Sequence, residues 1–148
     1  MSGAPRTPGA PWAVNPATLA PPVGYSHGIA AQGTHLFVAG QVGWDAAAKI
    51  VSGGFVAQFE QALANVVAVV VEAGGEPGHL TRLRIYVTDL AVYRGALAEV
   101  GAAYRRRMGK HFPAMALVQV AGLLEDGALV EIEADAVLPA ARARGESA

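Results

Sequence analysis

The 148-residue chain contains no cysteine, which excludes disulfide bonds, a thiol nucleophile and a thiolate metal site. Charged residues make up only 16% of it, below the usual ~25%. With a net charge of −1, the chain carries no electrostatic footprint for a nucleic-acid partner. The four histidines are scattered without the spacing of metal ligands, so we expect neither a metal site nor a cofactor.

Long apolar runs are also missing. The most apolar stretch, residues 66–71, is far too short to cross a bilayer. The first twenty residues contain no continuous apolar segment of the kind that a signal peptide needs. We therefore expect a cytoplasmic protein without a membrane partner.

Hydrophobic residues, mostly small Ala and Val, nevertheless make up 53% of the chain. This excess fits apolar surface hidden in an oligomer. It fits equally a compositional bias, which also shows in nine Arg against two Lys. At this length we expect one domain over residues 12–137. Residues 1–11, with three prolines and two glycines, should be a disordered lead-in, and residues 138–148 a flexible tail.

Two segments show helical periodicity. In the first, apolar residues recur at spacings of 4, 4, 3 and 4, and Gly74-Gly75 ends the pattern. The second covers residues 91–108, with spacings of 4, 3 and 4 and Gly109 as a C-cap. The apolar residues are Phe55, Phe59, Leu63, Val66 and Val70 in the first segment, and Tyr93, Leu97, Val100 and Tyr104 in the second.

The remaining segments alternate as strands do. Residues 25–31 and 35–41 are predicted to form a hairpin around Gln32-Gly33, and an alternative adds a further short strand before Tyr25. Residues 80–87 form a strand, and residues 112–137 form two strands joined by a turn. Since each helix has a single apolar stripe, both should cover one face of a mixed sheet in an α+β fold. The uncovered face then carries charges, namely Arg82, Arg84, Glu131, Glu133 and Asp135.

Five short segments, in order, resemble one family. They are GYSHG at 24–28, FVAGQVG at 37–43, AQFEQALANV with Gln58 and Asn65, IYVTDL at 85–90, and the FPA and EIEA elements within 112–137. Together they resemble the Rid family of reactive intermediate/imine deaminases, also called the YjgF family. The resemblance implies a chorismate-mutase-like α+β domain that forms a homotrimer with clefts between its subunits.

The resemblance also implies a chemistry, the hydrolysis of an enamine or imine to a ketone and ammonia. The family's catalytic glutamate falls on Glu131. The residues implied to bind the substrate are Tyr25, Ala39, Gly40, Gln41, Pro113, Ala114, Met115 and Leu117. Three of these depart from the family pattern: Met115 stands for an arginine that grips a carboxylate, Ala39 for a serine and Leu117 for a cysteine. Because a thioether cannot hold a carboxylate, we expect a substrate that is not gripped in this way. The alternative is that another cation replaces the arginine, such as Arg84 or Arg106, or the whole run Arg105–Arg107 together with Lys110.

Alternatives remain open at each level. Glu131 could be a structural carboxylate paired with Arg82 or Arg84 across the trimer. Met115 could belong to the core. The protein could be a small-molecule imine hydrolase, a catalytically inactive trimer that binds a small ligand or acts as a regulatory module, or, with least support from the sequence, a ribonuclease.

Overall fold

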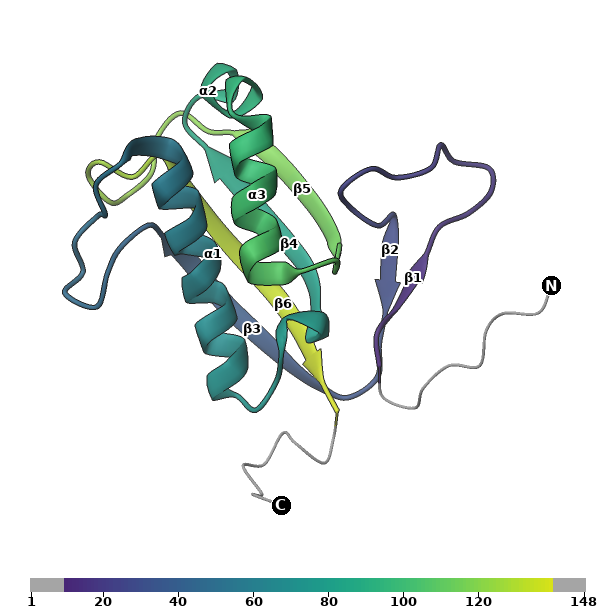
Figure 1. The fold of residues 1–148 in the computed structure, drawn as a ribbon. Helices are drawn as coiled ribbons and strands as arrows, with labels where there is room; N and C mark the ends of the chain where they lie inside the picture. The colour runs from purple at the N-terminus through teal and green to yellow at the C-terminus, as the bar shows by residue number, and fades with distance from the viewer. Residues whose placement is uncertain (1–9, 140–148) are drawn as a thin grey trace.

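A mixed four-stranded sheet forms the centre of the structure, a computed structural model that describes residues 10–139 (Figure 1). Its strands are β3 (Thr34–Val42), β6 (Val130–Leu138), β4 (Leu80–Val87) and β5 (Ala114–Gln119), side by side in that order. β6 is antiparallel to both of its neighbours, whereas β4 and β5 are parallel. The mixed sheet of an α+β fold is thereby confirmed. β4 lies between β5 and β6, so the two strands that follow each other in the chain do not pair.

Helices cover one face of this sheet (Figure 1). They are α1 (Gly54–Glu72), the short 3-10 helix η1 (Pro77–His79), α2 (Leu90–Gly95) and α3 (Leu97–Met108). The predicted apolar stripe of α1 is buried, and Phe59, Leu63 and Val66 lie in one core cluster with residues of β4 and β6. α1 has the length and hydropathy of a membrane-spanning helix. Its buried stripe is, however, that of a core helix.

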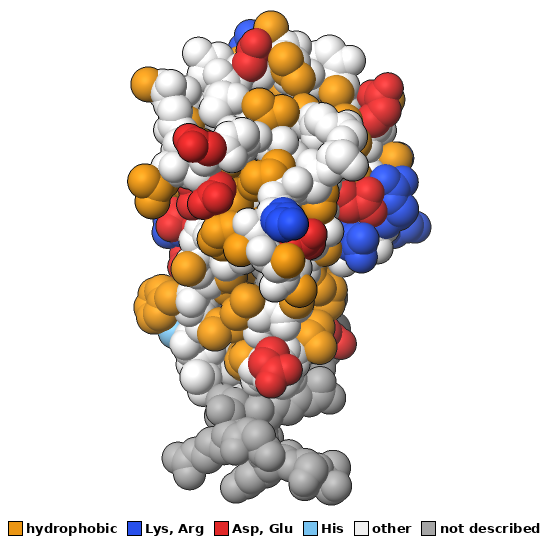
Figure 2. All heavy atoms as spheres, turned by 90° about the vertical axis from the view of Figure 1, so that its left-hand side faces the viewer, with side chains coloured by type: hydrophobic (Ala, Val, Ile, Leu, Met, Phe, Trp, Pro, Cys, Tyr) orange, Lys and Arg blue, Asp and Glu red, His pale blue; other side chains and the backbone are white. Residues whose placement is uncertain are grey.

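Figure 2 shows the side of the molecule that carries α1. Apolar side chains run down the middle of this side, and acidic and basic side chains are scattered around them. The charges of α1 itself are few, because Glu60 and Glu72 are its only charged residues.

The predicted second helix is in fact two. The chain leaves helical geometry at Ala96, where φ is −121° and the backbone N–H bonds Tyr93 instead of continuing the helix. Gly95, just before the break, has a low helix propensity. The predicted C-cap is confirmed, since Gly109 has a φ of +61° and donates its N–H to the carbonyl oxygen of Arg105.

The predicted hairpin around Gln32-Gly33 is wrong. β2 (Gly28–Ala30) pairs with β1 (Trp12–Val14) in a separate two-stranded sheet, whereas β3 pairs with β6. Gly33 explains the difference, because its φ is +147° and a Cβ there would lie 1.9 Å from the carbonyl oxygen of Leu138. This glycine lets the chain pass against the end of β6, and the pairing of β3 is set by that distant strand.

The predicted C-terminal tail begins too early. Leu138 is the last residue of β6, and its side chain is buried. Residues 140–148 lie outside the described residues, as do residues 1–9 of the predicted lead-in.

Side chains divide between the two sheet faces as the alternation predicts. Leu83, Ile85 and Val87 are buried among the helices, and Ile132 joins them from β6. The uncovered face carries the charged residues of β4 and β6. It also carries Phe37 and Val118, which are 76% and 47% exposed.

Candidate functional site

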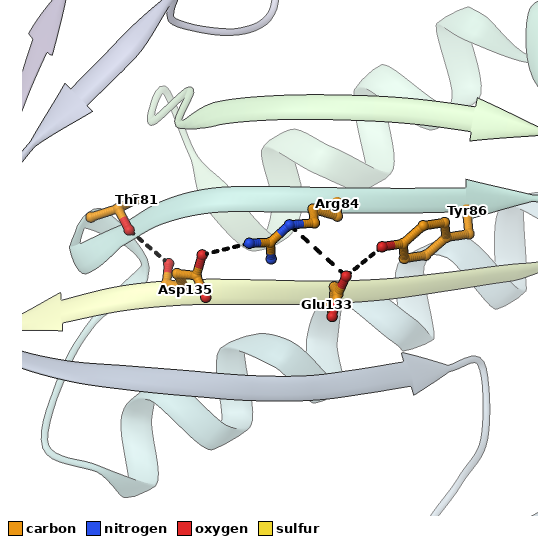
Figure 3. A network of polar contacts seen from close by, with 5 residues as sticks. All are labelled: Thr81, Arg84, Tyr86, Glu133 and Asp135. Atoms are coloured by element: carbon orange, nitrogen blue, oxygen red, sulfur yellow. Dashed lines mark hydrogen bonds and ion pairs between the residues drawn. The ribbon is translucent and has the colours of Figure 1, made fainter.

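Three of the charged side chains on the uncovered face, those of Arg84, Glu133 and Asp135, form one network (Figure 3). Arg84 lies between two carboxylates, with its Nη2 atom 3.1 Å from Oδ2 of Asp135 and its Nε atom 3.9 Å from Oε1 of Glu133. Tyr86 donates its hydroxyl hydrogen to Glu133, and this hydrogen bond raises the pKa of the phenol. Glu133 and Asp135 are therefore occupied by neighbours in their own chain, which favours the structural interpretation for both.

Glu131 differs from these two carboxylates. Within residues 10–139 its side chain makes no hydrogen bond or ion pair. Arg84, one of its two suggested partners, is already neutralised by Glu133 and Asp135. Of the three acidic residues on β6, Glu131 is thus the one left free to act on a ligand or a water molecule.

A bulge in β3 receives the Glu131 side chain. Val38 pairs with Ala134 and Gln41 with Ile132, so Ala39 and Gly40 together oppose the single residue between them on β6. Such bulges bend a strand and re-aim side chains, often next to active sites. A Cβ at Gly40 would lie only 2.1 Å from Oε1 of Glu131, so the carboxylate rests directly over the glycine backbone. The structure therefore brings together Glu131, Gly40 and the neighbouring Ala39 and Gln41.

Met115 and Leu117 lie elsewhere. They pair with Leu83 and Ile85 of β4, whose side chains are buried, and both pack against the core on the helix-covered face. There they line a cavity of about 300 Å³ between the sheet and α3. Most of the other walls are apolar or aromatic and include Tyr93, Tyr104 and Phe112. Both tyrosines belong to the predicted apolar stripe of residues 91–108, and the 55% exposure of Leu97 between them shows that this stripe is incompletely covered.

Tyr25 is held near the same strand. Its neighbour Ser26 donates its backbone N–H to Pro113 and its hydroxyl hydrogen to Phe112, with distances of 3.1 and 2.6 Å. These bonds fix the segment to the start of β5, where Tyr25 lines a second cavity of about 300 Å³ with Ala114 and Met115. The role of Ser26 was missed, because a serine before a histidine gives no sequence signal for an anchor 86 residues away.

The expected site residues thus form two groups. The first group, Ala39, Gly40, Gln41 and Glu131, lies on β3 and β6. The second group, Tyr25, Pro113, Ala114, Met115 and Leu117, lies on or beside β5. β3 and β5 are opposite edges of the four-stranded sheet, and Glu131 and Met115 point to opposite faces. One chain alone does not unite them.

Gln58 and Asn65, two residues of the family resemblance on α1, serve as loop anchors. Gln58 accepts from the N–H of Leu129 and donates to the carbonyl of Gly127. Asn65 donates to the carbonyls of Val42 and Trp44. These bonds fix the ends of β6 and β3 beside Glu131. Within residues 10–139 no group of three His, Asp or Glu side chains is arranged to hold a metal ion.

Comparisons with known proteins agree with this architecture. Residues 16–138 match the family model described as Endoribonuclease L-PSP. Protein DfrA of Myxococcus xanthus is 39% identical over 106 residues, which are 71% of this chain and 77% of that protein. The 2-iminobutanoate/2-iminopropanoate deaminase of Capra hircus is 32% identical over 123 residues, covering 82% and 83% of the two chains. The crystal structure of YyfB from Yersinia pestis, a protein of unknown function in the Rid family, superposes with a TM-score of 0.78 at 34% identity, covering 87% and 99% of the two chains.

Proposed function

The chain belongs to the Rid family, also known as the YjgF or L-PSP family, and we propose that it hydrolyses a reactive imine or enamine with release of ammonia. The observation that carries this proposal is the free carboxylate of Glu131, held over the backbone of Gly40 beside two carboxylates that are already paired. The similarity to a named 2-iminobutanoate/2-iminopropanoate deaminase supports the same chemistry.

The proposed reaction requires a positioned water molecule and a group that transfers protons. Water adds to the imine carbon to give a carbinolamine, both protons of that water pass to the nitrogen, and the C–N bond breaks to leave a ketone and ammonia. Glu131 accepts a proton from the attacking water and returns it to the departing nitrogen, as a general base and then a general acid. Positioning of the water and the substrate contributes much of the remaining acceleration.

We propose a homotrimer as the form that completes the site. Glu131 and Gly40 of one copy would meet the β5 side of a neighbour, where Tyr25, Met115 and Leu117 lie. The division of the expected residues into two groups supports this arrangement, and so does an uncovered sheet face with exposed Phe37 and paired charges. Light scattering coupled to size-exclusion chromatography tests it: a mass near three times the 15.2 kDa of the chain supports the proposal, and a monomer contradicts it.

The two β5 side chains at the positions of the family's arginine and cysteine, Met115 and Leu117, are apolar in this protein. Met115 and Leu117 offer no charge and no hydrogen-bond donor to a carboxylate. We propose that the substrate is not gripped through a carboxylate by β5, and that its apolar part lies against these two side chains.

A test of the function measures ammonia release from freshly generated 2-iminopropanoate, with Glu131→Ala as the matched variant. We expect hydrolysis above the buffer rate for the wild type and a loss of about 10²–10⁴-fold for the variant. A wild-type rate equal to buffer would instead favour an inactive trimer that binds a small ligand, which the apolar cavity and Met115 also suit. For ribonuclease activity we find little support, because the chain has a net charge of −1 and three of its arginines, Arg84, Arg106 and Arg107, are paired with carboxylates.

A further inference from the structure

The cavity under α3 has an apolar interior. It measures about 300 Å³, at the lower end of the range for small-molecule sites, and so suits a ligand of amino-acid size. The hydroxyl of Tyr104 is occupied, because it donates to the carbonyl of His111 at 2.6 Å, and its ring stacks on Phe112 with centroids 5.5 Å apart. Tyr104 and Phe112 therefore offer the interior aromatic contact rather than hydrogen bonds.

One cation lines this cavity. Arg105 belongs to a run of three arginines at the end of α3, but its neighbours are both neutralised by Glu60. Arg106 makes two hydrogen bonds to that carboxylate, at 2.9 and 2.8 Å, and Arg107 an ion pair at 3.4 Å. The Arg105 side chain makes no hydrogen bond or ion pair with any of residues 10–139.

The exposed Arg105 side chain passes beside a glycine one turn earlier in the helix. Its Nη1 atom lies 3.5 Å from the point that a Cβ of Gly101 would occupy. Gly101 also lines the cavity. Because Gly101 has no side chain, nothing at that position separates the guanidinium from the apolar interior.

We propose that this cavity binds a small carboxylate with an apolar side chain, held by Arg105 at its charged end and by Met115, Leu117 and Tyr93 along its apolar end. A guanidinium fork matches one carboxylate with two parallel hydrogen bonds, whereas a phosphate site normally gathers several donors. This inference rests on the proposed function and narrows its substrate to 2-imino acids with apolar side chains. The carboxylate is then held by α3 and not by β5, through one of the arginines that the sequence left open as a replacement for the missing one.

Calorimetric binding of stable 2-oxo acids tests the site without requiring turnover. We expect 4-methyl-2-oxopentanoate to bind the wild type about tenfold or more tightly than pyruvate, because its larger side chain buries more apolar surface. Its methyl ester, which lacks the charge, should bind about tenfold more weakly than the acid. Arg105→Gln should cause a loss of about tenfold in affinity for the acid and remove the preference for acid over ester.

Arg106→Gln is the matched control, since it removes the same charge one residue away from a side chain already paired with Glu60. It should change the affinity by less than about twofold. Equal binding of the acid by wild type and Arg105→Gln would overturn the inference, as would an equal loss in both variants.

Imine hydrolysis and the carboxylate site at Arg105 can be refuted independently of each other. If 4-methyl-2-oxopentanoate binds through Arg105 but no imine is hydrolysed above the buffer rate, the proposed function fails and the carboxylate site stands. If ammonia release depends on Glu131 but Arg105→Gln leaves 2-oxo acid binding unchanged, the function stands and the carboxylate site is refuted.

Discussion

Gly40→Ala tests the arrangement of Glu131 with a single methyl group. The added Cβ would lie 2.1 Å from Oε1 of Glu131 and 2.9 Å from Cδ, whereas ordinary contact begins at 3.4 Å. The carboxylate must therefore withdraw by about 1.3 Å. A misplacement of about 1 Å in a catalytic group can cost about 10²-fold in rate, so we expect a loss of that order in ammonia release from 2-iminopropanoate.

The same substitution should hardly affect stability. Gly40 is not among the glycines with positive φ, so alanine can adopt its backbone conformation. The displaced group is the end of a side chain that is only partly buried. Gly28→Ala is a suitable control, because its Cβ would meet Val14 at an ordinary 3.6 Å and should leave the rate unchanged.

A second substitution compensates for the added methyl group. Glu131→Asp shortens the side chain by one methylene, about the distance that the new methyl demands. The double variant Gly40→Ala/Glu131→Asp should therefore be about as active as Glu131→Asp alone, so the two substitutions should not be additive. If Gly40→Ala has the wild-type rate while Glu131→Ala is inactive, the position of the carboxylate over Gly40 has no part in catalysis.

Further predictions concern the core and the salt bridges. Phe59→Ala, at a fully buried position, should lower the free energy of unfolding in urea by about 3–5 kcal/mol, and a loss below about 1 kcal/mol would contradict the core described here. The pKa of Glu60 is lowered from its ordinary value of 4.5, chiefly by hydrogen bonds from Arg106. The ionised Glu60 carboxylate therefore stabilises the folded protein above pH 4.5, and this stabilisation is lost as the pH falls through the folded-state pKa. We expect the wild type to be more stable than Glu60→Gln at neutral pH, and the difference to vanish in acid. Urea titrations of both proteins at about pH 7 and pH 3 check this linkage, and a difference that grows in acid would refute it.

Much of the fold follows from local periodicity. The stripe on α1, the bounds of β4 and the alternation of β6 were predicted correctly, because each depends on residues that are neighbours in the sequence. The family was predicted from five short segments and is shown by the comparisons.

Distant contacts account for the errors. Gln32-Gly33 has the composition of a hairpin turn, but Gly33 is needed where the chain passes the end of β6. The break at Ala96 lies inside an uninterrupted apolar stripe, so periodicity could not reveal it.

The division of the expected site residues into two groups could not be predicted from the sequence either. The alternation along β5 indicates that Met115 and Leu117 lie on the same face of the sheet. Only the register of β5 against Leu83 and Ile85 shows that this is the helix-covered face. Nor does the sequence indicate which of three successive arginines is left unpaired, since Glu60 lies on another helix.

The most direct test of the account mixes two inactive variants. Glu131→Ala removes the carboxylate group of the site, and Gly101→Trp fills the mouth of the apolar cavity. If a site takes its carboxylate from one copy and its cavity from another, refolding the two variants together in equal amounts should restore about a quarter of the wild-type rate of ammonia release, because each site draws both halves at random. A mixture as inactive as either variant alone would contradict the account.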